Sequence, residues 1–267
     1  MDVLLYLDPS PRGEWALAAT ALLRPDSELQ VWLLATTEDA RMQPGLFASA
    51  RARLGGGVAG EAVLPGPAED AVGAALARRD YGLVVVPPAG RNAVQRMLRG
   101  SRVAQVVHRV RVPVLVARRP PERVGRLLAA LSGGGSTEAV CAAAAFLARR
   151  LEATVAGVHV ASEVPLPFGR GESGAGAGPE PDLPRLLHAR QALQAAVPGA
   201  EVLRRDGLVV DEVLEELDRG AYQALVIGAS DHAARGFGRE DVAERLLLGS
   251  PATTLVVPVS PAPPQRP

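Results

Sequence analysis

The 267-residue chain contains no lysine, because all 29 of its basic residues are arginine. A Walker-type phosphate loop and a Schiff-base enzyme both depend on a lysine side chain, so these two classes are excluded. Aromatic residues make up only 3% of the sequence. Proteins that bind single-stranded nucleic acids stack bases on aromatic rings and are usually basic, whereas here 29 carboxylates balance the arginines. We therefore expect no nucleic-acid partner.

Cysteine and long hydrophobic runs are also scarce. The single cysteine, Cys141, cannot form an internal disulfide and suits a reducing compartment. It stands in an alanine-rich run, where we expect a buried thiol of low reactivity. No stretch has the roughly 20 apolar residues that span a bilayer, and the first residues do not resemble a secretory signal. We expect a cytoplasmic protein with no membrane partner.

Short apolar runs alternate with helix-like stretches along the chain, a pattern typical of α/β proteins with a mostly parallel sheet. Their near-continuous hydrophobicity is typical of strands that are buried on both faces. The predicted strands are 3–7, 31–35, 61–64, 83–86 and 112–116, then 124–131, 155–160, 201–203, 224–227 and 253–257. The predicted helices are 14–23, 45–54, 68–79, 101–109, 138–150, 186–196 and 211–217.

The pattern restarts after a proline-containing junction near residue 120, and the two halves can be aligned. An offset of 124 residues aligns 8 with 132 and 36 with 160, whereas an offset of 141 aligns 81 with 222 and 87 with 228. Because offsets this constant indicate duplication, we predict two domains, 1–119 and 122–260. The glycine- and proline-rich segment 162–184 accounts for the longer second half and is predicted to be a loop, and 258–264 to be an extended tail.

A glycine-containing segment follows the predicted strand 83–86. Gly90 comes shortly after this strand, and the pair Gly100-Ser101 follows after nine further residues. Glycine lets a ligand approach the backbone closely, and a Gly-Ser pair at a helix start offers N–H groups and a hydroxyl to an anion. Residues 87–119 contain eight arginines and no carboxylate, and guanidinium groups suit phosphate oxygens. This segment is a candidate phosphate site.

These residues resemble the universal stress protein family, in a tandem form that covers nearly the whole chain. Nucleotide-binding members carry two glycines, nine residues and a Gly-Ser/Thr pair after the fourth strand, and an aspartate at the end of the first strand. The resemblance implies two Rossmann-like domains of the adenine nucleotide alpha hydrolase-like type, each a five-stranded parallel sheet flanked by helices. It also implies that the closing strands, 112–117 and 253–257, pair as an intramolecular pseudo-dimer, and it leaves a homodimer possible.

The resemblance further implies an adenine nucleotide site in the first domain, where the ligand would be ATP with Mg²⁺. Asp8 would meet the ribose or adenine, and Thr36 would line the base. The residues implied to contact phosphates are Gly90, Gly100, Ser101 and Arg102.

The sequence departs from the family pattern in both halves. Pro87 stands where the first signature glycine is expected, and it removes a backbone N–H near the ribose and phosphates. In the second half Gly228 restores this glycine, but Glu240 and Asp241 replace the Gly-Ser pair and would repel a triphosphate. Ser132 also replaces the first-strand aspartate. We therefore expect any nucleotide to occupy the first half before the second.

Other motifs favour structural roles. The glycines of 55–60 fit a dinucleotide-binding string, but they stand between a helix and a strand, so we predict a flexible loop. Residues 133–137 are predicted to form a turn with a Ser or Thr helix cap. The four histidines lack metal-ligand spacing, and no serine stands in a nucleophile elbow.

We therefore expect a regulatory, nucleotide-binding protein that is not an enzyme. One alternative is a structural or interaction protein whose sites bind nothing and which acts through dimerisation or partner docking. A third alternative, slow ATP hydrolysis or phosphoryl transfer, has no visible general base or pair of metal ligands.

Overall fold

A computed structural model describes residues 1–88, 112–118, 122–161, 182–230 and 242–259, and every structural statement below concerns these residues. The elements of the first half are β1 (Asp2–Tyr6), α1 (Gly13–Leu22), β2 (Gln30–Thr36), α2 (Thr37–Met42), α3 (Leu46–Leu54), the 3₁₀ turn η1 (Gly55–Gly57), β3 (Val58–Leu64), α4 (Ala68–Leu76), β4 (Leu83–Val86) and β5 (Val114–Val116). Those of the second half are β6 (Arg126–Ala130), α7 (Thr137–Leu151), β7 (Thr154–Ala161), α8 (Asp182–Ala196), β8 (Glu201–Asp206), α9 (Val209–Arg219), β9 (Ala224–Ser230), α10 (Val242–Gly249) and β10 (Thr253–Val259).

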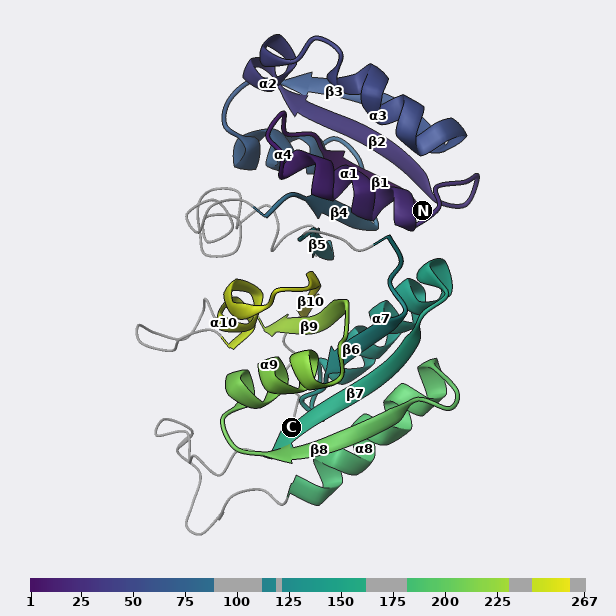
Figure 1. Ribbon diagram of the computed structural model, residues 1–267, viewed down its shortest axis with the longest axis vertical. Coiled ribbons are helices and arrows are strands. Elements are labelled where there is room, and N and C mark those ends of the chain that lie inside the picture. The colour runs from purple at the N-terminus through teal and green to yellow at the C-terminus, as the bar shows by residue number, and fades with distance from the viewer. Residues whose placement is uncertain (89–111, 119–121, 162–181, 231–241, 260–267) are drawn as a thin grey trace, which may run out of the picture.

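The strands form one ten-stranded sheet in the order β3-β2-β1-β4-β5-β10-β9-β6-β7-β8 (Figure 1). All pairs within a half are parallel, whereas β5 and β10 are antiparallel, with Leu115 opposite Leu255. Each half is thus a five-stranded parallel sheet flanked by helices, and the predicted fold class is confirmed. The pairing that we expected between the two closing strands is present in the sheet.

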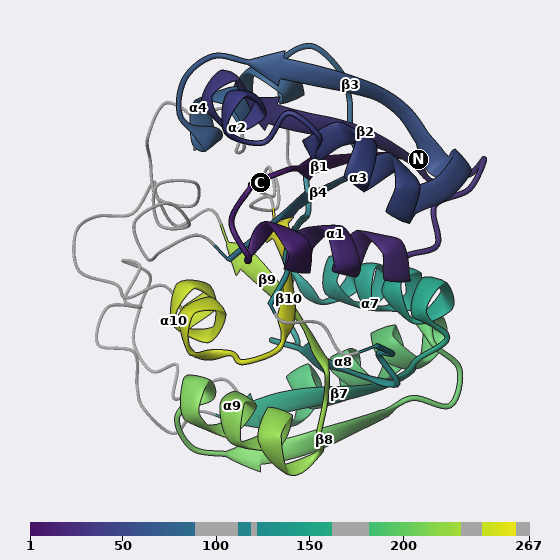
Figure 2. The same ribbon diagram turned by 45° about the horizontal axis from the view of Figure 1, so that its top comes forward.

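Two apolar layers cover the faces of this sheet. On one face α1, α3, α7 and α8 contribute to a core that includes Leu33, Leu127 and Leu147. On the other face α4, α9 and α10 pack over Leu4, Leu225 and neighbouring strand residues. Both cores draw residues from the two halves, so each apolar layer continues from one half to the other. Figure 2 shows the helices of both halves around the shared sheet.

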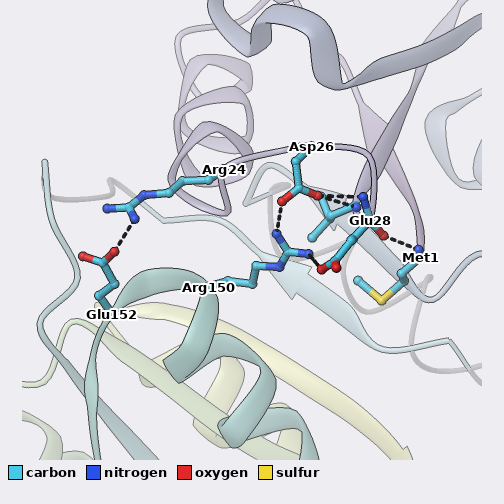
Figure 3. A network of polar contacts seen from close by, with 7 residues as sticks. Met1, Arg24, Asp26, Glu28, Arg150 and Glu152 are labelled. Carbon is cyan, nitrogen blue, oxygen red and sulfur yellow. Dashed lines mark hydrogen bonds and ion pairs between the residues drawn. The ribbon is translucent and has the colours of Figure 1, made fainter.

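Charged side chains join the halves at the ends of α1 and α7. Arg24, just after α1, pairs with Glu152, just after α7 (Figure 3). In the other pairs the arginine comes from the second half: Arg150 of α7 pairs with Asp26 at 2.7 Å and with Glu28 at 3.5 Å, both of which follow α1. We call these five residues the seam. It lies at the surface, because most of these side chains are exposed.

Most predicted elements are present with small shifts at their ends, but three predictions about loops were wrong. The glycines at 55–57 form a 3₁₀ turn and Gly60 lies within β3, which begins at Val58, so the segment is not a flexible loop. A Cβ on Gly60 would lie 2.3 Å from the ring of Trp32, so a tertiary contact fixes this part of the strand. The predicted loop to residue 184 ends earlier, because α8 begins at Asp182. The predicted tail from 258 begins inside β10, which continues to Val259.

Two described helices, α2 and α10, were not predicted. Helix α2 has only six residues and no buried side chain, so it lacks the apolar periodicity by which helices are recognised. Helix α10 does bury an apolar face that includes Leu246 and Leu247. The predicted helix 101–109 and most of the predicted loop after Ala161 lie outside the described residues.

Candidate functional site

The strand order reverses between β1 and β4 in the first half and between β6 and β9 in the second. At such a switch point the connections leave the sheet on opposite faces, and the carboxyl ends of the strands border a crevice in which α/β proteins bind ligands. Asp8 follows β1 and Pro87 follows β4, so both border the first crevice. Ser132 follows β6 and Gly228 lies near the end of β9, at the second.

Asp8 is held in a tight loop between β1 and α1. Its Oδ1 atom accepts a hydrogen bond of 2.7 Å from the backbone N–H of Ser10. Its carbonyl group lies directly against Gly13, where a Cβ atom would be only 1.7 Å from the carbonyl oxygen. The absence of a side chain at Gly13 therefore allows the loop to approach the start of α1, and this contact fixes the main chain of Asp8.

Thr36 belongs to a hydrogen-bond network at the end of β2. Its hydroxyl donates to Oδ2 of Asp39 at 2.6 Å and accepts from the N–H of Asp39 at 3.1 Å, forming a capping box that begins α2. The phenol of Tyr6, on β1, also donates to Oδ2 of Asp39 at 2.6 Å. Thr36 is buried, at 5% exposure, and its hydroxyl is committed to this cap.

The network gives the crevice beside β1 and β2 an acidic character. Burial and the hydrogen bond to Asp39 raise the pKa of Tyr6 well above its ordinary value, and the negative charges of Asp39 and Asp8 act in the same direction. The phenol therefore remains a donor at physiological pH. Sequence reasoning missed Tyr6 and Asp39, although the order Thr-x-x-Asp after an apolar run is a signal for such a cap.

Beside β4, the structure describes only the first two residues after the strand, Pro87 and Pro88. Pro87 and Pro88 are buried and end β4 after Val86, because proline cannot donate to a strand ladder. The predicted phosphate contacts lie outside the described residues: Gly90, Gly100, Ser101 and Arg102. Of the predicted nucleotide site, the structure therefore describes Asp8 and Thr36.

The second crevice differs at both of its described edges. Where Pro87 ends β4, the aligned Gly228 continues β9 and pairs with Val257, and the ladder extends to Ser230. Ser132, which aligns with Asp8, lies 2.9 Å from Ser136 between their hydroxyl oxygens and accepts a hydrogen bond from the N–H of Gly134. Ser136 stands at the predicted cap position of α7, but its side chain makes no capping hydrogen bond. Glu240 and Asp241 lie outside the described residues.

Other chemical groups of the described chain fit structural roles. Cys141 is buried in α7, and burial raises the pKa of its thiol to about 11, which accords with the low reactivity expected of it. Among the described residues, no three histidine, cysteine or carboxylate side chains gather in a way that could hold a metal ion. Within the same part of the chain no helix has the length and apolarity needed to cross a membrane.

Comparisons with known proteins give a consistent assignment. The sequence profile described as the universal stress protein family matches the chain twice, at residues 3–118 and 124–258. No curated protein sequence matches the chain. The fold is similar to that of a universal stress protein from Archaeoglobus fulgidus, with 14% identity, a TM-score of 0.68 and coverage of 96% of this chain and 98% of the other.

Two further solved structures share this fold. One is a putative universal stress protein from Pseudomonas aeruginosa, with 16% identity, a TM-score of 0.67 and coverage of 97% and 93% of the two chains. The other is the cytoplasmic domain of a prokaryotic cation chloride cotransporter, with 11% identity, a TM-score of 0.57 and coverage of 96% and 94%. At these identities the likeness concerns the fold alone.

Proposed function

Because the chain belongs to the universal stress protein family, we propose that it is a regulatory protein that binds an adenine nucleotide in its first half. The proposal rests mainly on Asp8, which lies at the carboxyl end of β1 beside the switch point to β4. The sequence after β4 retains Gly90, Gly100 and Ser101 in the spacing of the family's nucleotide-binding members. In this proposal these residues border one crevice from both of its sides, as is usual for ligands at a switch point.

Charge favours one orientation of the ligand. Asp8 and Asp39 make the side near β1 and β2 acidic, which suits ribose hydroxyls and the exocyclic amine of adenine rather than phosphate. The arginines of the segment 87–119 suit the phosphates. In this proposal Asp8 contacts the ribose or base and the methyl group of Thr36 lines the base. Gly90, Gly100, Ser101 and Arg102 contact the phosphates of an ATP molecule with its Mg²⁺.

The second half would remain without nucleotide. Its counterpart of the Gly-Ser pair is Glu240-Asp241, and two carboxylates repel a triphosphate. Ser132 replaces the acidic group that would accept the ribose hydroxyls. We take the functional units to be residues 1–119 and 122–260, joined as a pseudo-dimer through β5 and β10 in a cytoplasmic protein. Antiparallel pairing of these strands supports this arrangement, because it uses the closing strands of both halves within one chain.

Isothermal titration of the full chain with ATP and Mg²⁺ tests the proposal. We expect one site per chain, loss of the heat in Gly100→Glu, and unchanged binding in Gly135→Glu. Gly135 is a matched control because it lies in an exposed loop of the second half and no atom lies within 4 Å of its Cβ position. No heat at millimolar nucleotide, or equal heats for Gly100→Glu and the parent protein, would refute nucleotide binding.

Pro87 favours a second candidate function, in which the protein binds no nucleotide and acts by docking a partner protein. Proline at this position is buried and supplies no N–H to a ligand. The titration decides between the two functions, together with mass spectrometry of material released when the purified protein is denatured. A nucleotide in that material supports the first function. Phosphate release that depends on Asp8 or Ser101 would instead indicate catalysis, which the proposal does not include.

A further inference from the structure

His159 lies buried on β7, with only 3% of its surface exposed, where β6 ends and α8 begins. Its Nδ1 atom is 2.8 Å from the carbonyl oxygen of Leu131, and its Nε2 atom is 2.8 Å from Oδ1 of Asp182, the first residue of α8. A carbonyl oxygen and an ionised carboxylate can only accept hydrogen bonds. Both bonds therefore form together only when the two ring nitrogens carry hydrogen, as in the imidazolium ion.

His188, further along α8, has the same two kinds of hydrogen-bond partner, although 40% of its side chain is exposed. Its Nδ1 atom lies 3.0 Å from the carbonyl oxygen of Gly133, and its Nε2 atom lies 2.7 Å from Oε1 of Glu138 on α7. The hydrogen bond to the backbone of Gly133 and that to Glu138 raise the pKa of His188 above its ordinary value. The main chain of α8 also touches this loop, because a Cβ on Gly133 would lie 2.4 Å from the carbonyl oxygen of Arg185.

The charged groups around both rings keep the carboxylates ionised. Burial opposes ionisation of Asp182, but hydrogen bonds from Arg204 on β8 and from His159 lower its pKa below the ordinary value. Arg204 itself pairs with Asp206. A backbone hydrogen bond and the hydrogen bond from His188 lower the pKa of Glu138, whose charge also acts on the buried thiol in α7. At neutral pH each histidine therefore faces a negative carboxylate.

We propose that His159 and His188 form a clasp that holds the first two turns of α8 on the loop between β6 and α7, and that His188 is the proton-operated part of it. When the ring of His188 is neutral, one of its nitrogens presents a lone pair to an oxygen acceptor, and that contact becomes repulsive. For His188, whose folded pKa is raised, the stabilisation is complete below its unfolded pKa of about 6.5 and is lost as pH rises through the folded pKa. The clasp is closed at mildly acidic pH and loosens at mildly alkaline pH.

The clasp belongs to the second half alone. The offsets of 124 and 141 align His159 with Ala35 and His188 with Phe47, which do not titrate. The loop that the clasp holds begins at the carboxyl end of β6, beside the switch point to β9. Protonation thus sets the exposure of one edge of the second crevice, whether or not nucleotide binds in the first half.

Hydrogen exchange of the full chain, followed by mass spectrometry between pH 5.5 and 8.5, tests the clasp. After correction for the intrinsic exchange rate, we expect the protection of residues 182–190 to fall at least tenfold across this range. Protection of β9 in the core should stay constant. Constant protection of residues 182–190 would overturn the proposal.

Variants separate the clasp from ordinary packing. His188→Gln should flatten the pH profile of α8. In Glu138→Gln the amide can donate to a neutral ring nitrogen of His188, so this variant should also lose much of the pH dependence while remaining folded. Glu201→Gln, an exposed residue of β8, is the control and should keep the parent profile. A parent-like profile in both His188→Gln and Glu138→Gln would refute the clasp.

Discussion

Replacing Gly13 with alanine should destabilise the first half and displace Asp8. The added Cβ would lie 1.7 Å from the carbonyl oxygen and 2.7 Å from the carbonyl carbon of Asp8, far inside van der Waals contact. Both obstacles are main-chain atoms, so no change of side-chain rotamer can relieve the overlap. Either the loop after β1 or the first turn of α1 has to move.

The size of the effect follows from two opposing contributions. Overpacking costs about 1–3 kcal/mol in general, and we expect the upper end here because backbone has to shift. Alanine in a helix recovers up to about 1 kcal/mol relative to glycine. The net loss should be about 2 kcal/mol, which corresponds to a fall in Tm of roughly 4–8 °C for a chain of this size. If Asp8 contacts the nucleotide, the variant should also bind it more weakly.

Urea and thermal unfolding followed by circular dichroism measure the first effect, and isothermal titration measures the second. Gly135→Ala is the matched control, because this glycine occupies the corresponding loop of the second half and its Cβ position is open. We expect the control to unfold within about 0.5 kcal/mol of the parent protein. A Gly13→Ala variant as stable as the parent would refute the packing that fixes Asp8.

Three further substitutions or reactions test other parts of the fold. Leu255 lies at the buried centre of the β5–β10 pair, so Leu255→Ala should lower the free energy of unfolding in urea by about 3 kcal/mol. Leu208 is exposed, so Leu208→Ala should lower it by less than about 0.5 kcal/mol. Equal losses in the two variants would contradict the shared core. Cys141 should not react with a thiol reagent at pH 8 until the protein is unfolded, because burial raises its pKa to about 11; rapid native reaction would show that the thiol is accessible. Arg150→Ala should lower the Tm more in low salt than in 1 M salt, because salt screens ion pairs whose partners are exposed, as Asp26 and Glu28 are. A fall in Tm that is the same at both salt concentrations would contradict an electrostatic seam.

The sheet could be predicted from the sequence because parallel strands that are buried on both faces need continuous apolar runs. The runs at 83–86 and 224–227 form β4 and β9, interior strands next to β1 and β6, and their apolar side chains pack into both layers. The beginning of β3 could not be predicted in this way, since Val58–Gly60 has no such run. Its conformation depends on Trp32, a residue of the neighbouring strand, and only the folded chain brings the two together.

Site residues that directly follow a strand could be predicted from the sequence. Contacts between side chains of different elements could not. Asp8 follows β1 directly, so its place at the crevice follows from the strand prediction alone. The hydrogen bond between Tyr6 and Asp39 joins residues 33 positions apart, and that between His159 and Asp182 joins residues 23 apart. No sequence spacing reports such contacts, because they depend on how helices pack against strand ends.

Because the two halves are duplicated within one chain, they can carry opposite charges at the seam while the net charge of the chain stays at zero. Asp26 and Arg150 occupy equivalent positions at the offset of 124 residues, and they contact each other, so this position lies on the approximate two-fold axis between the halves. In a pair of identical halves a residue on the axis meets its own copy, and its charge would be repelled. A duplicated chain escapes this constraint, because its two halves diverge independently. The same divergence left 15 arginines against 11 carboxylates in residues 1–119, and 14 against 18 in the remainder. The opposite excesses of charge therefore favour the pairing of unlike halves, which is the pairing that β5 and β10 make.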